Sequence, residues 1–177
     1  MMRRCFPRAC GVALVVALLA ACATQPPPPP PPPPPIDTVA LVAQIRAAAG
    51  PDDAKDELAI RPLRDPMVED LRMQAARLET EGKYAEAAAA LDQALTIVSD
   101  DPALVQERAE AAIYAGQFGA AAAFALQAYG MGAQVGPLCR RHWATIRIAR
   151  EQQHDVAGAN AATQQFGACK VTAPPRY

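Results

Sequence analysis

Apolar residues follow three successive patterns along this chain. A continuous apolar stretch, residues 9–21, comes first and is too short for an ordinary membrane-spanning helix of about 20 residues. Ten consecutive prolines, residues 26–35, follow it. From residue 65 onward, apolar residues recur at helical spacing without strand-like alternation of useful length. The pattern predicts an all-α domain behind an N-terminal export segment and a proline spacer.

Residues 36–49, between the prolines and this domain, are predicted to form a short helix. Asp37 is positioned to cap its first turn, because its side chain can accept from the free backbone N–H groups there. Gly50 and Pro51 end it, since glycine tolerates a left-handed backbone and proline cannot continue a helix. The apolar residues at helical spacing are Val39, Val42 and Ile45.

Two later helices have clear start signals. Asp65 and Asp101 each precede a proline, which gives a capping carboxylate followed by proline at the first helical position. Residues 52–64 mix charges with Pro62 and show no sustained period. We therefore expect a loop there, ahead of the helix that starts after Asp65.

The first 22 residues have the layout of a secretory signal. Three arginines fall within the first eight residues and precede the apolar stretch. Residues 19–22, Leu-Ala-Ala-Cys, resemble the lipobox of bacterial lipoproteins. That resemblance implies that Cys22 is lipidated and becomes the mature N-terminus, and that Ala23 directs the protein to the outer membrane of a Gram-negative cell, on its periplasmic side. The alternatives are a plain secretory signal or an uncleaved anchor.

The proline run predicts a stiff spacer. Polyproline II rises about 3.1 Å per residue, so residues 26–35 would span roughly 30 Å between a lipid anchor and the domain. Two or more acyl chains on the cysteine would hold the protein stably at the membrane. The alternative is that the run is a ligand for a proline-binding domain.

The domain contains an internal repeat. Residues 82–95 and 116–129 align at an offset of 34 residues, the tetratricopeptide period. The pattern resembles that family, with a glycine in the turn, an aromatic residue opening the second helix and small alanines where helices cross. The matched pairs are Gly82 with Gly116, Tyr84 with Phe118, Ala87 with Ala121, and Ala94 with Ala128.

A third, degenerate copy follows. Val156 takes the place of the aromatic residue, Trp143 the large position of the first helix, and His154 that of the turn glycine. This alignment needs about four inserted residues, which we expect within 130–136. The resemblance implies a right-handed superhelix of about three helical hairpins preceded by a short helix. The expected organisation is a signal peptide at 1–21, a lipidated cysteine and spacer at 22–35, a leading helix and loop at 36–66, the repeat domain at 67–170 and a tail at 171–177.

Five cysteines divide by position. Cys5 and Cys10 lie in the signal, and Cys22 is the predicted lipid acceptor. Cys139 and Cys169 flank the third repeat, whose antiparallel helices would bring them together. We expect a disulfide between them, as suits an oxidising compartment. The alternative is two free, buried thiols.

Composition and charge narrow the function. The net charge is −1, whereas proteins that bind nucleic acids usually carry an excess of basic residues. His142, His154 and the single serine, Ser99, form no motif for nucleophilic or metal chemistry. We expect no enzymatic activity, no metal and no cofactor.

A partner-binding surface is the remaining prediction. In tetratricopeptide domains the first helices line a groove for a partner's peptide or helix. The resemblance implies a lipoprotein that binds another envelope protein and aids assembly of an envelope complex of pilus or secretion type. The alternatives are a regulator that contacts a cell-wall synthase across the periplasm, homo-oligomerisation through exposed helix faces, or ordinary solvated residues at these positions. The groove residues are Arg72, Gln106, Glu110, Tyr114, Arg141 and Ile148, joined by Ala76, Ile113 and Ala144.

Overall fold

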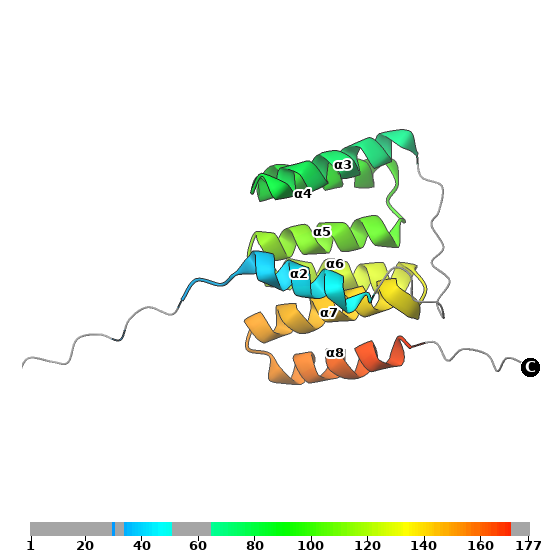
Figure 1. Cartoon of the computed structure of the whole chain (residues 1–177). Helices are drawn as coiled ribbons and strands as arrows, with labels where there is room; N and C mark the ends of the chain where they lie inside the picture. Colours follow the sequence, from blue (N-terminus) through cyan, green and yellow to red (C-terminus); the bar gives the residue numbers. More distant parts are fainter. Residues whose placement is uncertain (1–29, 31–33, 51–64, 171–177) are drawn as a thin grey trace, which may run out of the picture. The chain divides into compact units, whose positions relative to one another are not determined.

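Helices are the only regular elements in the described part of the chain, and Figure 1 shows their arrangement. The structure is a computed structural model that describes residue 30 and residues 34–50 and 65–170. Seven helices occur in these ranges, and no strand does. In chain order they are α2 (Thr38–Ala48), α3 (Pro66–Thr80), α4 (Tyr84–Ile97), α5 (Pro102–Tyr114), α6 (Phe118–Met131), α7 (Gly136–Gln152) and α8 (Val156–Ala168).

Six of the helices pack as sequential antiparallel pairs. The pairs are α3 with α4, α5 with α6, and α7 with α8, and each pair also contacts the next through α4 with α5 or α6 with α7. Helix α2 is different, because it packs against α7 and α5 rather than against its neighbour in sequence. The predicted all-α class and the succession of hairpins are therefore confirmed.

The predicted helix starts are confirmed by their caps. The Asp37 carboxylate accepts from the backbone N–H of Ala40 at 2.9 Å. The Asp65 carboxylate accepts from Met67 at 2.8 Å, and Asp101 caps α5 in the same way. Each cap satisfies a backbone donor that the first turn of a helix leaves without a partner.

The turns inside the three hairpins share one backbone conformation. Gly82 and Gly116 have φ of 73° and 69°. His154, predicted to take the place of the turn glycine, has φ of 59°. Few residues other than glycine adopt a positive φ. The third hairpin therefore keeps the turn geometry of the first two, although a histidine stands in place of the glycine.

The predicted insertion ahead of the third copy lies at residues 136–139 rather than within 130–136. The connection between α6 and α7, residues 132–135, is as long as residues 98–101 between α4 and α5. Helix α7 has 17 residues whereas α5 has 13. Counted back from the hairpin turn, the four extra residues are 136–139, the first turn of α7, which places Cys139 inside the helix.

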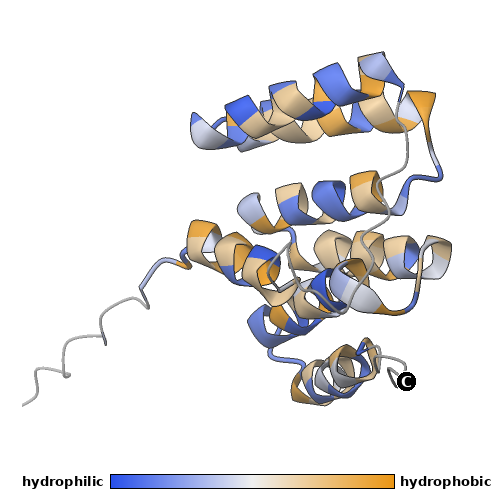
Figure 2. Cartoon of the chain, turned by 45° about the vertical axis from the view of Figure 1, so that its right-hand side comes forward, coloured by the Kyte–Doolittle hydropathy of each residue, from blue (hydrophilic) through white to orange (hydrophobic). Residues whose placement is uncertain are grey.

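The small residues of the repeat lie where helices meet. The four alanines matched between the copies are fully buried. Trp143 is half-buried, and its ring meets that of Tyr129 edge-on, with centroids 4.9 Å apart. Figure 2 shows apolar and hydrophilic positions sharing each helix, as expected for helices with one buried side. The buried alanines are Ala87, Ala94, Ala121 and Ala128.

Several predictions fall outside this description. The signal peptide, Cys22, most of the proline run and the loop at 52–64 are not among the described residues. Within the described ranges, no helix is both long and apolar enough to cross a membrane.

Candidate partner-binding face

Helix α2 lies across α5 and α7 on the side where the predicted groove residues gather. We call the side of α3, α5 and α7 that faces α2 the inner face. Val42 and Ile45 of α2 are fully buried in a cluster that includes Ile113 of α5 and Ile148 of α7. The inner face therefore holds a helix of the same chain through aliphatic contacts.

A carboxylate with no exposed surface stands beside this apolar contact. The side chain of Glu110, on α5, is fully buried. Arg46 of α2 donates from Nε to Glu110 Oε2 at 2.8 Å. Arg141 of α7 donates to both carboxylate oxygens, at 2.7 Å from Nη2 to Oε2. Gln106 adds a bond at 2.9 Å. Glu110 thus joins α2, α5 and α7 at one point.

The ionisation of Glu110 follows from these partners. Burial alone would raise its pKa, because a charged carboxylate loses its hydration. Arg141 and Arg46 outweigh that effect, and the pKa of Glu110 lies below its usual value. The carboxylate is therefore charged at neutral pH, as a buried acid paired with two guanidinium groups should be.

The polar contacts continue inward to a histidine. Gln106 Nε2 donates to Thr145 Oγ1 at 2.8 Å, so its Oε1 faces His142 Nδ1, also at 2.8 Å. An amide oxygen only accepts, which places the proton on Nδ1. Burial, assisted by Arg141, lowers the pKa of His142 to about 4, so the ring is neutral at pH 7. We call Glu110, Arg46, Arg141, Gln106, Thr145 and His142 the Glu110 network.

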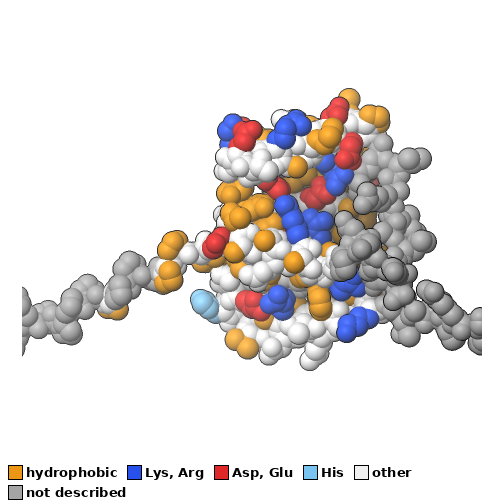
Figure 3. Space-filling view, viewed as in Figure 1, with side chains coloured by type: hydrophobic (Ala, Val, Ile, Leu, Met, Phe, Trp, Pro, Cys, Tyr) orange, Lys and Arg blue, Asp and Glu red, His pale blue; other side chains and the backbone are white. Residues whose placement is uncertain are grey.

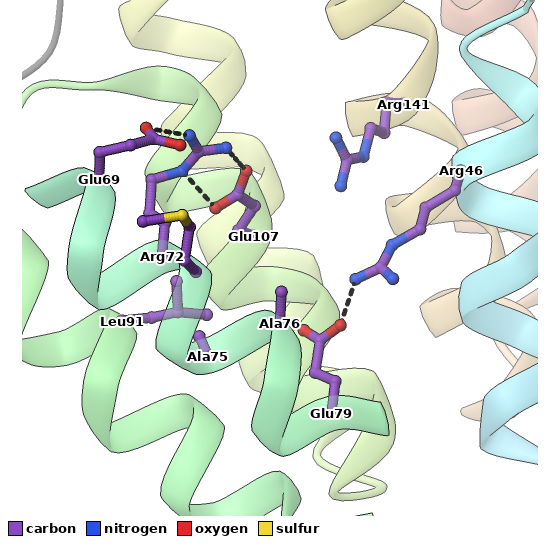
Figure 4. Close-up of a pocket in the computed structure, with 10 residues that line it drawn as sticks. Arg46, Glu69, Arg72, Ala75, Ala76, Glu79, Leu91, Glu107 and Arg141 are labelled. Carbon is purple, nitrogen blue, oxygen red and sulfur yellow. Dashed lines mark hydrogen bonds and ion pairs between the residues drawn. The ribbon is translucent and has the colours of Figure 1, made fainter. Parts of the chain in front are cut away.

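A cavity of about 260 Å³ lies on the part of the inner face next to α3. Figure 3 shows cationic and acidic side chains side by side in this hollow, between α3 and α2. Figure 4 shows Arg72 of α3 directed at Glu107 of α5, and these two form a bidentate pair, with 2.8 Å from Nε to Oε2. The lining residues are Arg46, Glu69, Arg72, Met73, Ala75, Ala76, Glu79, Leu91, Glu107 and Arg141.

Arg46 forms one wall of the cavity as well as joining the Glu110 network. Its Nη2 donates to Glu79 of α3 at 2.8 Å, as Figure 4 shows. Burial raises the pKa of Glu79 above its usual value despite this ion pair. A single arginine of α2 thereby bridges α3 and α5 across the cavity.

The predicted groove residues divide into two groups. Arg72 and Arg141 line the cavity and keep 20% and 21% of their side-chain surface exposed. Gln106, Glu110 and Ile148 are buried, so they are closed to solvent while α2 is in place. That the groove binds a partner stays a prediction.

Tyr114 connects the inner face to the first hairpin. Its ring stacks on Tyr84 with centroids 4.4 Å apart, and its carbonyl accepts from Thr38 Oγ1 at 3.3 Å. Ala76 is exposed at the cavity, whereas Ile113 and Ala144 are buried in the core.

Sequence reasoning missed the contribution of α2 to this face. The ion pairs of the inner face involve Arg46, Glu79 and Glu107, and none of these three was predicted as a site residue. Arg46 directly follows Ile45 in a helix otherwise free of charged residues. That isolated arginine beside the apolar stripe was the available signal.

The predicted bridge between Cys139 and Cys169 is present. Their Cα atoms are 5.7 Å apart, within the range of disulfides. The backbone N–H of Gly136 also donates to the carbonyl of Cys169 at 2.8 Å. The start of α7 and the end of α8 are therefore joined twice, and a disulfide is typical of proteins outside the reducing cytosol.

No protein-family model matches this chain, and no curated protein matches it.

Proposed function

We propose that this chain is a non-enzymatic outer-membrane lipoprotein whose tetratricopeptide-type domain binds another envelope protein and aids assembly of an envelope complex. The observation that carries the proposal is that the inner face already holds a helix. Aliphatic side chains and one arginine seat α2 on it, and a cavity stays open beside α3. Partner helices are commonly recognised in such grooves.

The cavity offers a partner both apolar and charged contacts. Met73 and Ala76 expose apolar surface, while Arg72 and Glu107 stand at the rim. A well-packed apolar anchor surrounded by charged groups is the usual composition of an interaction hot spot. The proposed occupant is therefore a segment that inserts an aliphatic or aromatic side chain between these charges.

Filling the cavity tests this proposal without replacing any residue of the Glu110 network. We expect full-length lipoprotein carrying Ala76→Trp to lose crosslinking to its envelope partner, because the indole would occupy the open space. Ala89→Trp adds the same ring at an exposed position of α4 outside the cavity and should retain the partner. Equal capture by both variants and the unmodified protein would show that another surface is used.

The anchor is tested separately. Cys22→Ser should abolish metabolic labelling with palmitate and release the protein from the membrane fraction, because two or more acyl chains are needed for stable attachment. Continued labelling of the Cys22→Ser protein would contradict the lipobox assignment.

A further inference from the structure

We infer that α2 is an internal ligand of the inner face, and that the partner supplies an amphipathic helix of the same chemistry that takes its place. The required pattern is two aliphatic residues three positions apart with an arginine directly after the second. In α2 these residues are Val42, Ile45 and Arg46. The inference rests on the proposed function of this face and adds the class of partner and a mode of regulation.

The placement of α2 is that of a bound segment rather than of a repeat helix. Every other described helix packs against its neighbour in sequence, whereas α2 packs against α5 and α7 and reaches α3 through the ion pair of Arg46 with Glu79. One side of it is buried through Val42 and Ile45, and the other faces solvent, with Val39 52% exposed. A one-sided apolar stripe laid on a helical surface is the recurrent geometry of helix-in-groove recognition.

Charge complementarity specifies the arginine. Arg46 meets Glu110 at 2.8 Å and Glu79 at 2.8 Å, from α5 and α3 respectively. One guanidinium group is thus bound by two carboxylates that come from different helices. Since a lysine presents a single ammonium, it would not reach both acids with the same planar geometry.

The buried Glu110 stays paired when α2 leaves, whereas the more accessible Glu79 loses its ion pair with Arg46. Glu110 would keep both bonds from Arg141 and the one from Gln106. Its charge would therefore stay paired, and the main change would be exposure of apolar surface around Ile113 and Ile148. Because exposed apolar surface is unfavourable in water, this surface favours binding of another amphipathic helix in place of α2.

Competition by α2 sets the affinity of the partner. Because α2 belongs to the same chain, it is present at a high effective concentration. A partner helix with the same contacts therefore binds weakly to the resting protein and more tightly whenever α2 is loosened. Helix α2 thus lowers the apparent affinity of the inner face for the partner helix until α2 itself is displaced.

The test uses the full chain and a fluorescent peptide of residues 36–50. In a fluorescence anisotropy titration, Ile45→Asp in the protein should loosen α2 and tighten peptide binding at least tenfold over the unmodified chain. Val39→Asp, which places the same charge on the exposed side of α2, should leave binding unchanged. A peptide with Arg46→Ala should bind at least tenfold more weakly than the native peptide, and equal binding would overturn the recognition of arginine.

Hydrogen exchange on the unmodified protein gives a second test that needs no substitution and therefore does not depend on the folding of a variant. The α2 amides should exchange through a local opening, faster than those of α5 and α7, and excess native peptide should accelerate them. Exchange of α2 only together with α5 and α7 would show a fixed structural helix and overturn the inference. Partner capture sensitive to Ala76→Trp would then still stand, so the two proposals fail separately.

Discussion

The first and last hairpins share one design but are attached to the molecule differently. The α3–α4 hairpin meets the rest through α4 against α5 and through ion pairs at the cavity, such as Arg72 with Glu107. The α7–α8 hairpin is closed by a disulfide, supports α2 and sends Arg141 to the buried Glu110. Similar helical hairpins can therefore differ in rigidity according to how deeply their polar contacts are buried.

Burial determines what an arginine–carboxylate pair contributes. Exposed pairs are worth about 0–1 kcal/mol, because water competes for both groups. Loss of one partner from a buried pair costs about 3–5 kcal/mol, because an unpaired charge is left inside. We therefore expect the last hairpin to be the stable end of the domain and the first hairpin to be the adaptable one.

The largest expected effect comes from Glu110. Glu110→Ala leaves Arg141 without its carboxylate and should lower the free energy of unfolding by about 3–5 kcal/mol, measured by urea denaturation. Glu107→Ala removes the partly exposed counterpart that Arg72 binds, and should lower it by about 1 kcal/mol. Equal losses in the two variants would remove the proposed difference between the hairpins.

The disulfide gives the next effect. Replacing Cys139 and Cys169 together by alanine opens a loop with a sequence separation of 30 and should lower the free energy of unfolding by about 3–4 kcal/mol. Hydrogen exchange should then quicken in α7 and α8 while α3 and α4 keep their rates. Two thiols that react in the unreduced native protein would show instead that the bridge does not form.

The smallest of the three effects depends on pH. The pKa of His142 is lowered to about 4 in the folded state, against 6.5 for the free side chain. The unfolded chain therefore binds a proton that the folded chain does not, and stability falls as the pH drops from about 6.5 to 4. The loss attributable to this group should be about 3 kcal/mol by pH 4.

A variant pair isolates that histidine. His142→Gln should flatten the decline between pH 6.5 and 4 in a series of urea denaturations. His154→Asn removes the other imidazole, which is exposed in the turn between α7 and α8, and should leave the decline intact. A native slope in the His142→Gln protein would assign the pH dependence to other groups.

Local features of the fold could be predicted because each depends on a few neighbouring residues. The aspartate caps at Asp37, Asp65 and Asp101 follow from the backbone donors at a helix start. The hairpin turns follow from glycines 34 residues apart, and His154 shows that the repeat position predicts the turn even when the residue changes. These predictions needed no knowledge of distant contacts.

The position of α2 could not be predicted in the same way. Its amphipathic pattern shows that one side is buried but not which surface covers it. Gln106 and Glu110 are four residues apart, a spacing that on an exposed helix indicates two solvated polar groups. Their burial depends on Arg46 and Arg141, which come from helices 64 and 31 residues away in sequence.

The place of α2 in the chain has a mechanical consequence. It begins three residues after the last proline of the run, so any pull on the segment that precedes it reaches α2 before any other described helix. Its contacts with α5 and α7 would carry that load first, while the covalently closed hairpin of α7 and α8 resists extension. With the proposed lipid anchor in place, tension on the proline run would detach α2 and uncover the inner face, so that the distance between the membrane and the proposed partner would control access to the site.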